Sequence, residues 1–252
     1  MGPHVYVYYY YCSHAQNEKK IEMNMRTRLP VYSKFKGFSV RAGAVIKSLL
    51  GDWNKKANVE VAKIQANCVK YGLRVKRSGD IMGLGLFCDK PIIQKRTKLA
   101  VYSGDFANCN VGSKKLIAYS DYDISTELVI KYANGQREKI HIYVCGNPKK
   151  DRPLVFNAAI RANHACVPNC EFLKQNITVK SSQKESLTMP LMYLQSISGE
   201  IIGAKEELTW NYGKDYVKQD YAKIAKSQQK FYKPCLCNGG ACPLNSCMLF
   251  KH

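Results

Sequence analysis

Residues Asn163 to Asn169 gather several reactive groups in one short segment. They read Asn-His-Ala-Cys-Val-Pro-Asn, and so combine amide, imidazole and thiol side chains with a rigid proline. Such a density of chemically useful groups is unusual for a structural turn, and it indicates a functional loop. The structural alternative is a capped loop around a buried, hydrogen-bonded histidine.

A second polar segment, residues 206–213, reads Glu-Glu-Leu-Thr-Trp-Asn-Tyr-Gly, and a cysteine cluster follows it farther along the chain. Cys235, Cys237 and Cys242 place three thiols within eight residues. Tetrahedral zinc needs four ligands, so the fourth would be Cys247 or a distant cysteine folded back. Free thiols in a loose tail are the alternative. The chain has 11 cysteines, an odd number, and most are scattered singly, which argues against a disulfide framework.

Two further segments carry weaker signals. The segment Gly83-Leu84-Gly85-Leu86 has two glycines, which let a backbone bend sharply and approach a ligand closely. It lacks the third glycine and the following helix of a dinucleotide-binding loop, so an ordinary turn before a strand is the alternative. Tyr102 begins a Tyr-Ser-Gly step at the end of an apolar strand, and this step has no meaning alone.

Taken in order, these segments resemble the SET-domain family of protein lysine methyltransferases. Residues 83–87 are similar to the family's Gly-x-Gly segment, and residues 102–104 to its Tyr-x-Gly. The remaining matches are residues 163–169 to Asn-His-Ser-Cys-x-Pro-Asn, residues 207–213 to Glu-Leu-Thr-x-Asp-Tyr-Gly, and residues 235–242 to the post-SET Cys-x-Cys-x4-Cys. The resemblance covers residues 69–245, and the order of the patterns makes it specific.

The sequence departs from the family pattern at several positions. Ala165 replaces the usual serine, Asn211 the usual aspartate, and Lys205 a common glycine, while Ile160 stands where many members have arginine. The first two changes leave open a second interpretation, a catalytically inactive SET fold that serves as a binding module. A third is a basic, zinc-containing nucleic-acid-binding protein, although the tail lacks the histidine of a zinc knuckle.

The resemblance implies transfer of a methyl group from S-adenosylmethionine to the ε-amine of a lysine in a protein, with histone as the first substrate class. It implies that the cofactor is held by the segment from Gly83 to Leu86, by Asn163 and His164, and by Tyr212 and Tyr216. The Tyr212 hydroxyl would lie beside the transferring methyl and orient the amine, so Tyr212 is the expected catalytic residue.

Further roles follow from the same resemblance. Tyr102 and Trp210 would line the lysine channel. Tyr102 is also an expected catalytic residue. Tryptophan has no hydroxyl to hold a water molecule where extra methyl groups must go, so we expect di- or trimethylation, although its bulk could instead restrict the pocket. In post-SET members the cysteine of the Asn-His-x-Cys loop completes the zinc site. The expected zinc ligands are therefore Cys166, Cys235, Cys237 and Cys242.

The elements that position these residues are mostly short strands. Residues 1–68 form a basic, partly helical extension, in which apolar spacing over 41–69 predicts one or two amphipathic helices. Residues 69–232 form the expected SET domain, mainly β with short helices and a C-terminal pseudoknot, and residues 233–252 form the post-SET segment. Strands are predicted near residues 73–76, 85–88, 98–102, 128–132, 139–144, 178–179 and 191–197. Asn134-Gly135 predicts a hairpin turn, and residues 214–230 look helical.

Charge and hydropathy indicate which classes of partner, nucleic acid or membrane, the protein could bind. The 252 residues include 39 Lys and Arg against 19 Asp and Glu, a net charge of +20, which suggests secondary contact of the basic surface with DNA or RNA. No apolar run approaches the ~18 residues that span a bilayer, and the N-terminus lacks the pattern of a signal peptide. We therefore expect a soluble intracellular protein with no membrane partner, and the resemblance adds the nucleus or chromatin as its place.

Overall fold

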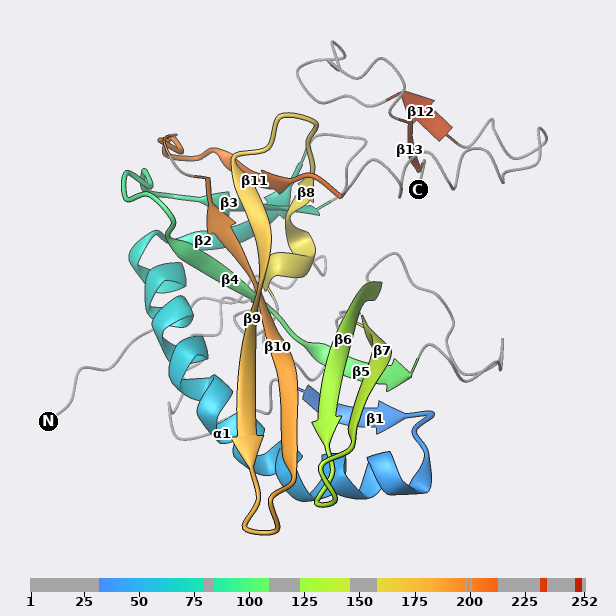
Figure 1. Ribbon diagram of the computed structural model, residues 1–252. Coiled ribbons are helices and arrows are strands. Elements are labelled where there is room, and N and C mark those ends of the chain that lie inside the picture. Colours follow the sequence, from blue (N-terminus) through green and yellow to red (C-terminus); the bar gives the residue numbers. More distant parts are fainter. Residues whose placement is uncertain are drawn as a thin grey trace, which may run out of the picture. The chain divides into compact units, whose positions relative to one another are not determined.

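The computed structural model describes residues 32–78, 84–108, 123–145, 158–197, 199, 201–212, 232–234 and 248–250, and these are mainly β (Figure 1). The chain divides into two compact units. The first combines residues 1–70, 99–160 and 174–193, and the second combines residues 71–98, 161–173 and 194–252. The mainly β architecture predicted from the sequence is confirmed at this level.

The first unit contains the helix α1 (Val40–Lys70), which is one continuous helix where one or two were predicted. The Ser39 Oγ accepts a hydrogen bond from the Ala42 N–H at 3.2 Å and so caps its N-terminus. The helix ends before Gly72, whose φ of 61° is the left-handed conformation favoured after a helix. Its buried face consists of Ala42, Val45, Ile46, Leu49, Leu50, Trp53, Ala57, Val61, Ile64 and Cys68.

The side chain of Trp53 fixes α1 against two strands of the first unit. Its ring is fully buried. The indole N–H is shared between the carbonyl oxygens of Ile177 at 3.0 Å and Met189 at 3.3 Å. These oxygens belong to neighbouring strands, so one side chain sets the position of the helix on both.

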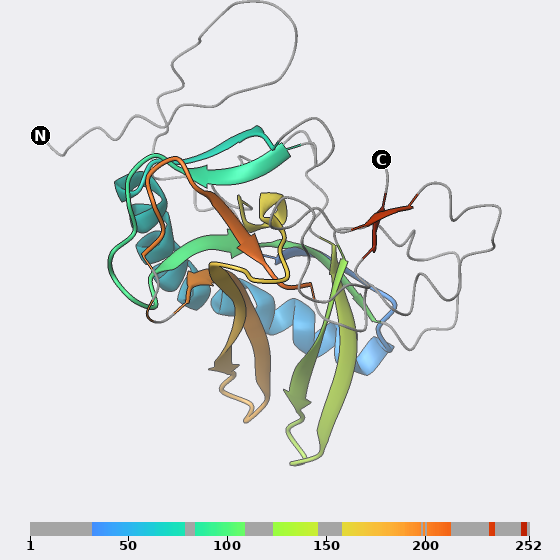
Figure 2. The same ribbon diagram turned by 90° about the horizontal axis from the view of Figure 1, so that it is seen from above.

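A seven-stranded sheet has the order β1-β5-β7-β6-β10-β4, with β9 paired to β10. Its strands are β1 (Tyr32–Lys36), β4 (Lys98–Tyr102), β5 (Gly104–Asn108), β6 (Asp123–Lys131), β7 (Arg137–Cys145), β9 (Cys170–Lys180) and β10 (Ser186–Ser196). The hairpins β6–β7 and β9–β10 lie side by side (Figure 2). Gly135 has a φ of 85° in the turn between β6 and β7, which confirms the predicted hairpin.

The second unit contains a four-stranded sheet with the order β2-β3-β11-β8. Its strands are β2 (Leu73–Arg77), β3 (Leu84–Cys88), β8 (Asn163–His164) and β11 (Glu207–Trp210). The 3-10 helix η2 (Ala158–Arg161) precedes β8, and β12 (Tyr232–Pro234) pairs with β13 (Met248–Phe250). The strands β3, β8 and β11 of this sheet contain residues of three of the sequence patterns.

Backbone strain occurs at Lys205, which has a φ of 67° in the turn before β11. That left-handed conformation is costly for a residue with a Cβ. The predicted helix at residues 214–230 lies outside the described residues. Among the helices that the structure does describe, none is long and apolar enough to cross a membrane.

Candidate functional site

Two segments that are far apart in the sequence form a parallel pair in the second unit. Asn163 and His164 of β8 lie opposite Thr209 and Trp210 of β11. The Ala165 N–H extends this pairing by donating to the Trp210 carbonyl oxygen at 3.1 Å. On its other edge β11 pairs with β3, so residues 207–210 lie between residues 84–88 and the Asn-His segment.

Asn169 holds the beginning of β11 in place. Its side-chain amide donates to the Glu206 Oε1 at 2.9 Å and to the Glu207 carbonyl oxygen at 2.7 Å. Its Oδ1 accepts from the Thr209 N–H at 2.9 Å. One side chain thereby supplies the hydrogen bonds that a neighbouring strand would give, and it ties the two polar segments together.

The Glu207 side chain joins three further segments. Its carboxylate accepts a hydrogen bond from the Ser78 Oγ at 2.5 Å and another from the Asn163 Nδ2 at 2.6 Å. The same Nδ2 also donates to the Leu84 carbonyl oxygen at 3.3 Å. A Cβ on Gly85 would lie 2.1 Å from the Glu207 Oε1. The close approach that this glycine permits is therefore made by a carboxylate of the protein itself.

The His164 ring has a fixed protonation pattern. Its Nδ1 lies 3.1 Å from the Tyr212 main-chain nitrogen, which can only donate, so the Nδ1 is the acceptor. The proton of the neutral ring is then on the Nε2, which lies 3.4 Å from the Cys166 Sγ. Burial lowers the pKa of His164 and so favours the same neutral form. The imidazole consequently adds no positive charge to the site.

An aromatic cluster surrounds the Ala162 carbonyl oxygen. That oxygen accepts from the Trp210 Nε1 at 3.1 Å and from the Tyr212 hydroxyl at 3.0 Å. The Trp210 ring lies 4.8 Å from the Phe172 ring and 4.6 Å from the Tyr212 ring. The Tyr212 ring also meets the His164 ring edge-on at 5.3 Å. Both donors are thus committed to one main-chain oxygen, and the rings support one another.

The carboxylates at this site have neutral partners. Glu206 accepts hydrogen bonds from the Asn169 amide and from the Gly203 N–H at 2.6 Å. Glu207 accepts from a hydroxyl and an amide. Among the described residues no lysine or arginine forms an ion pair with either carboxylate. In a chain of net charge +20, these two carboxylates thus have hydrogen-bond partners within the described residues that are neutral.

The hydrogen bonds limit how the Asn-His segment can contact a cofactor. Both hydrogens of the Asn163 amide are used within the protein, so only its Oδ1 and its main chain remain for a ligand. Both ring nitrogens of His164 are also engaged, which leaves its main chain. The cofactor contacts predicted for these two residues are therefore expected to be mainly with the backbone.

Two other predicted site residues, Tyr102 and Cys166, are described by the structure. Tyr102 is the last residue of β4, is only 3% exposed and belongs to the first unit. Cys166 is half-buried beside His164. Outside the described residues lie Gly83, Tyr216, Cys235, Cys237 and Cys242. No group of three metal-binding side chains occurs within the part of the chain that the structure describes, and the predicted zinc site depends on residues beyond it.

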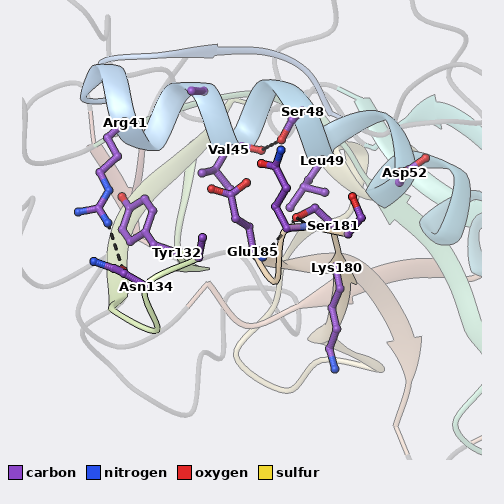
Figure 3. Close-up of a pocket in the computed structure, with 14 residues that line it drawn as sticks. Arg41, Val45, Ser48, Leu49, Asp52, Tyr132, Asn134, Lys180, Ser181 and Glu185 are labelled. Carbon is purple, nitrogen blue, oxygen red and sulfur yellow. Dashed lines mark hydrogen bonds between the residues drawn. The ribbon is translucent and has the colours of Figure 1, made fainter.

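A cavity of about 800 Å³ lies in the first unit, but none of its lining residues was predicted to be functional (Figure 3). It is bounded by α1, the β6–β7 turn and the β9–β10 turn. The Arg41 guanidinium at one end stacks 3.7 Å from the Tyr132 ring and is hydrogen-bonded to Asn134 and Gln136. This group is committed to the fold, and the cavity has no cluster of reactive side chains.

Several residues of the cluster had no role assigned from the sequence. These are Ser78, Ala162, Asn169, Phe172, Glu206 and Glu207. Asn169 and Glu207 lie within the segments 163–169 and 206–213, and this position could have indicated that they belong to the site. Ala162 acts through a main-chain oxygen, and Ser78 lies just before the glycine segment but outside it, so their residue types gave no signal.

No model of a protein family matches the chain, and no curated protein matches it.

Proposed function

We propose that the protein is a lysine methyltransferase that transfers a methyl group from S-adenosylmethionine to a protein substrate. One observation carries the proposal: β11 lies between β3 and β8, so the segments at residues 84, 164 and 212 meet at one end of a single sheet. Three sequence patterns that resemble one enzyme family would have no reason to converge if each were an ordinary turn.

The Tyr212 hydroxyl has a chemical role available to it. Its hydrogen is donated to the Ala162 carbonyl oxygen at 3.0 Å, so toward any other group the hydroxyl oxygen is an acceptor. A lysine amine that donates an N–H to this oxygen is held in one orientation, with its lone pair free to attack. Such alignment is the main contribution that an enzyme makes to a displacement reaction.

The surroundings of Tyr212 favour cationic ligands. The neutral rings of Phe172, Trp210 and His164 present aromatic faces and edges without a positive charge. Glu206 and Glu207 lack described cationic partners and add negative charge to the same unit. S-Adenosylmethionine supplies an electrophilic methyl group on a sulfonium cation, and the donor set fits that charge. We assign its binding to the backbone of residues 84–86 and of Asn163 and His164.

Trp210 bears on the number of methyl groups added. Its indole N–H donates to the Ala162 carbonyl oxygen, so the side chain has no further polar group that could hold water in the lysine channel. This supports di- or trimethylation, and a mass spectrum of the product over time measures it.

The remaining parts of the proposal rest on the family resemblance. Tyr102 lines the lysine channel, and zinc bound by Cys166 with the three tail cysteines ties the tail to the Asn-His loop. The substrate is a lysine-bearing protein, with histone as the first candidate, and the site of action is the nucleus or chromatin. Contact of the basic surface with DNA or RNA would strengthen recruitment and would weaken steeply with salt.

The test is transfer of tritium from labelled S-adenosylmethionine to histones and to proteins of a whole-cell extract. We expect labelling by the full chain and its loss in Tyr212→Phe. The matched control is Tyr132→Phe, which also removes a hydrogen-bonded hydroxyl, here bonded to Glu138, but in the first unit.

The outcomes separate the competing interpretations. Labelling that persists in Tyr212→Phe contradicts the role of this hydroxyl. A chain that binds S-adenosylmethionine but labels nothing is a binding module. A chain that binds nucleic acid but no S-adenosylmethionine is a nucleic-acid-binding protein.

A further inference from the structure

Glu207 is the residue at which the segments of the site meet. Its carboxylate accepts hydrogen bonds from Ser78, just after β2, and from Asn163, the first residue of β8. Asn163 then donates to the Leu84 carbonyl oxygen at the start of β3. Glu207 itself begins β11. A single side chain therefore links residues from all four strands of the sheet or from their ends.

The packing at Gly85 shows how tightly this carboxylate is held. A Cβ on Gly85 would lie 2.1 Å from the Glu207 Oε1, 2.8 Å from its Cδ and 2.9 Å from the Ser78 Cβ. Gly85 is buried within β3. The glycine is thus required by space, and the space is filled by the Glu207 carboxylate.

Among the described residues, no cation pairs with the charge of Glu207. Its described partners are a hydroxyl and an amide, both neutral. The function of the side chain in the fold is therefore to accept hydrogen bonds at two defined points. A glutamine could serve in part, because its Oε1 can accept from Asn163 while its amide donates to the Ser78 Oγ.

We propose that Glu207 is a positioning residue, which fixes the backbone of Leu84 to Leu86 relative to Asn163 and so sets the shape of the cofactor site. The effect on cofactor binding rests on the proposed function, whereas the effect on the backbone of β3 does not. Glu207 does not contact the reacting atoms in this scheme. It acts through Gly85 and Asn163.

The test compares Glu207→Ala, Glu207→Gln and Ser78→Ala in the full chain, with two measurements on each. The first is amide hydrogen exchange in the peptide containing residues 84–88, followed by mass spectrometry. The second is the Kd of S-adenosylmethionine by calorimetry, with kcat at saturating cofactor. Glu171→Gln is the control, because it makes the same change of charge in the same unit at a carboxylate whose described hydrogen bond is with Gln195.

We expect Glu207→Ala to speed exchange at residues 84–88 and to raise the Kd about tenfold or more, since hydrogen bonds to a charged group are lost. The value of kcat at saturation should change much less. Glu207→Gln should recover most of both effects, and Ser78→Ala should give a smaller loss in the same direction. Glu171→Gln should resemble the wild type in both measurements.

Two results would overturn the inference. One is wild-type exchange at residues 84–88 in Glu207→Ala, or in Ser78→Ala should the alanine variant of Glu207 not fold. The other is an unchanged Kd together with a large fall in kcat. If the wild-type chain binds no S-adenosylmethionine, the proposed function fails, and the exchange measurement alone decides whether Glu207 positions β3.

Discussion

The Tyr212 main-chain N–H donates to the His164 Nδ1 at 3.1 Å, and the two rings meet edge-on at 5.3 Å. The residue expected to orient the amine is thus anchored by the histidine of the other motif. Because the Nδ1 must accept, the neutral tautomer with the proton on the Nε2 is required. The geometry of Tyr212 consequently depends on a side chain from a strand that lies far from it in the sequence.

Substitution of His164 tests this dependence. His164→Ala leaves a partly buried N–H without an acceptor, at a cost of about 1–3 kcal/mol, and methyl transfer should fall about 100-fold. His164→Asn places a carbonyl oxygen near the position of the Nδ1 and should recover part of both. Chemical unfolding and initial rates measure the two effects. Equal activity of the alanine and asparagine variants would argue against the anchoring role.

Asn169 should be needed for the stability of the second unit. Asn169→Ala removes three hydrogen bonds and leaves the Thr209 N–H unsatisfied. We expect a loss of about 2–4 kcal/mol in the free energy of unfolding. Asn176→Ala, an exposed position on β9, should change it by less than about 0.5 kcal/mol. Similar losses in the two variants would contradict the assignment of Asn169 to the β11 junction.

Trp53 should be the most sensitive position of α1. Trp53→Phe removes a hydrogen bond shared by two carbonyl oxygens and leaves a cavity, so we expect a loss of about 2–4 kcal/mol. The midpoint of urea unfolding measures it. Val59→Ala on the same helix, at a side chain that is 60% exposed, should have little effect. A small effect of Trp53→Phe would show that α1 is held mainly by its other apolar contacts.

Burial of Cys68 predicts a loss of stability in alkali. Burial raises the pKa of this thiol from 9.0 to about 12. The unfolded chain loses the proton near pH 9.0 and the folded chain only near pH 12, so the contribution to stability is complete below the first value and falls as the pH rises toward the second. Cys68→Ala should therefore lose less unfolding free energy between neutral and alkaline pH than the wild type. Ile64→Val, a neighbour that does not titrate, should keep the wild-type slope.

Removal of zinc should lower activity as well as stability, if Cys166 ties the tail to the Asn-His loop. A chelator should reduce methyl transfer at a temperature where the second unit stays folded, and added zinc should restore it. Cys237→Ala should reproduce the loss, and Cys68→Ala, which removes a buried thiol outside the predicted zinc set, should not. Unchanged turnover in Cys237→Ala would count against the zinc site.

The sequence predicts those elements that have either a long periodic spacing of apolar residues or a turn specified by neighbouring residues. The apolar spacing of α1 extends over the whole helix, and Asn134-Gly135 specifies its turn through two neighbouring residues, so both predictions are confirmed. The strands β8 and β11 have two and four residues, too few for a period to be recognised, and they were known only as motifs. Strands β1 and β5 were also missed, since their sequences, Tyr-Ser-Lys-Phe-Lys and Gly-Asp-Phe-Ala-Asn, contain no β-branched residue.

The details of the site depend on contacts that no local pattern encodes. Ser78 and Glu207 are 129 residues apart, and neither residue type indicates the other. The role of Ala162 is carried by its main chain, so the identity of the side chain is uninformative. The motifs predicted which segments belong to the candidate site. The hydrogen bonds between these segments could be identified only from the fold.

The position of β11 between β3 and β8 also determines when the four-stranded sheet can form during synthesis. A ribosome delivers β2, β3 and β8 well before Glu207 to Trp210, and until then β3 has an unpaired edge and β8 lacks its partner in this sheet. Unpaired edges of this kind invite association with other chains. The nascent protein therefore passes through a stage in which β3 and β8 are present without the strand β11 that joins them. The yield of folded protein in cells should depend on how quickly β11 pairs with them.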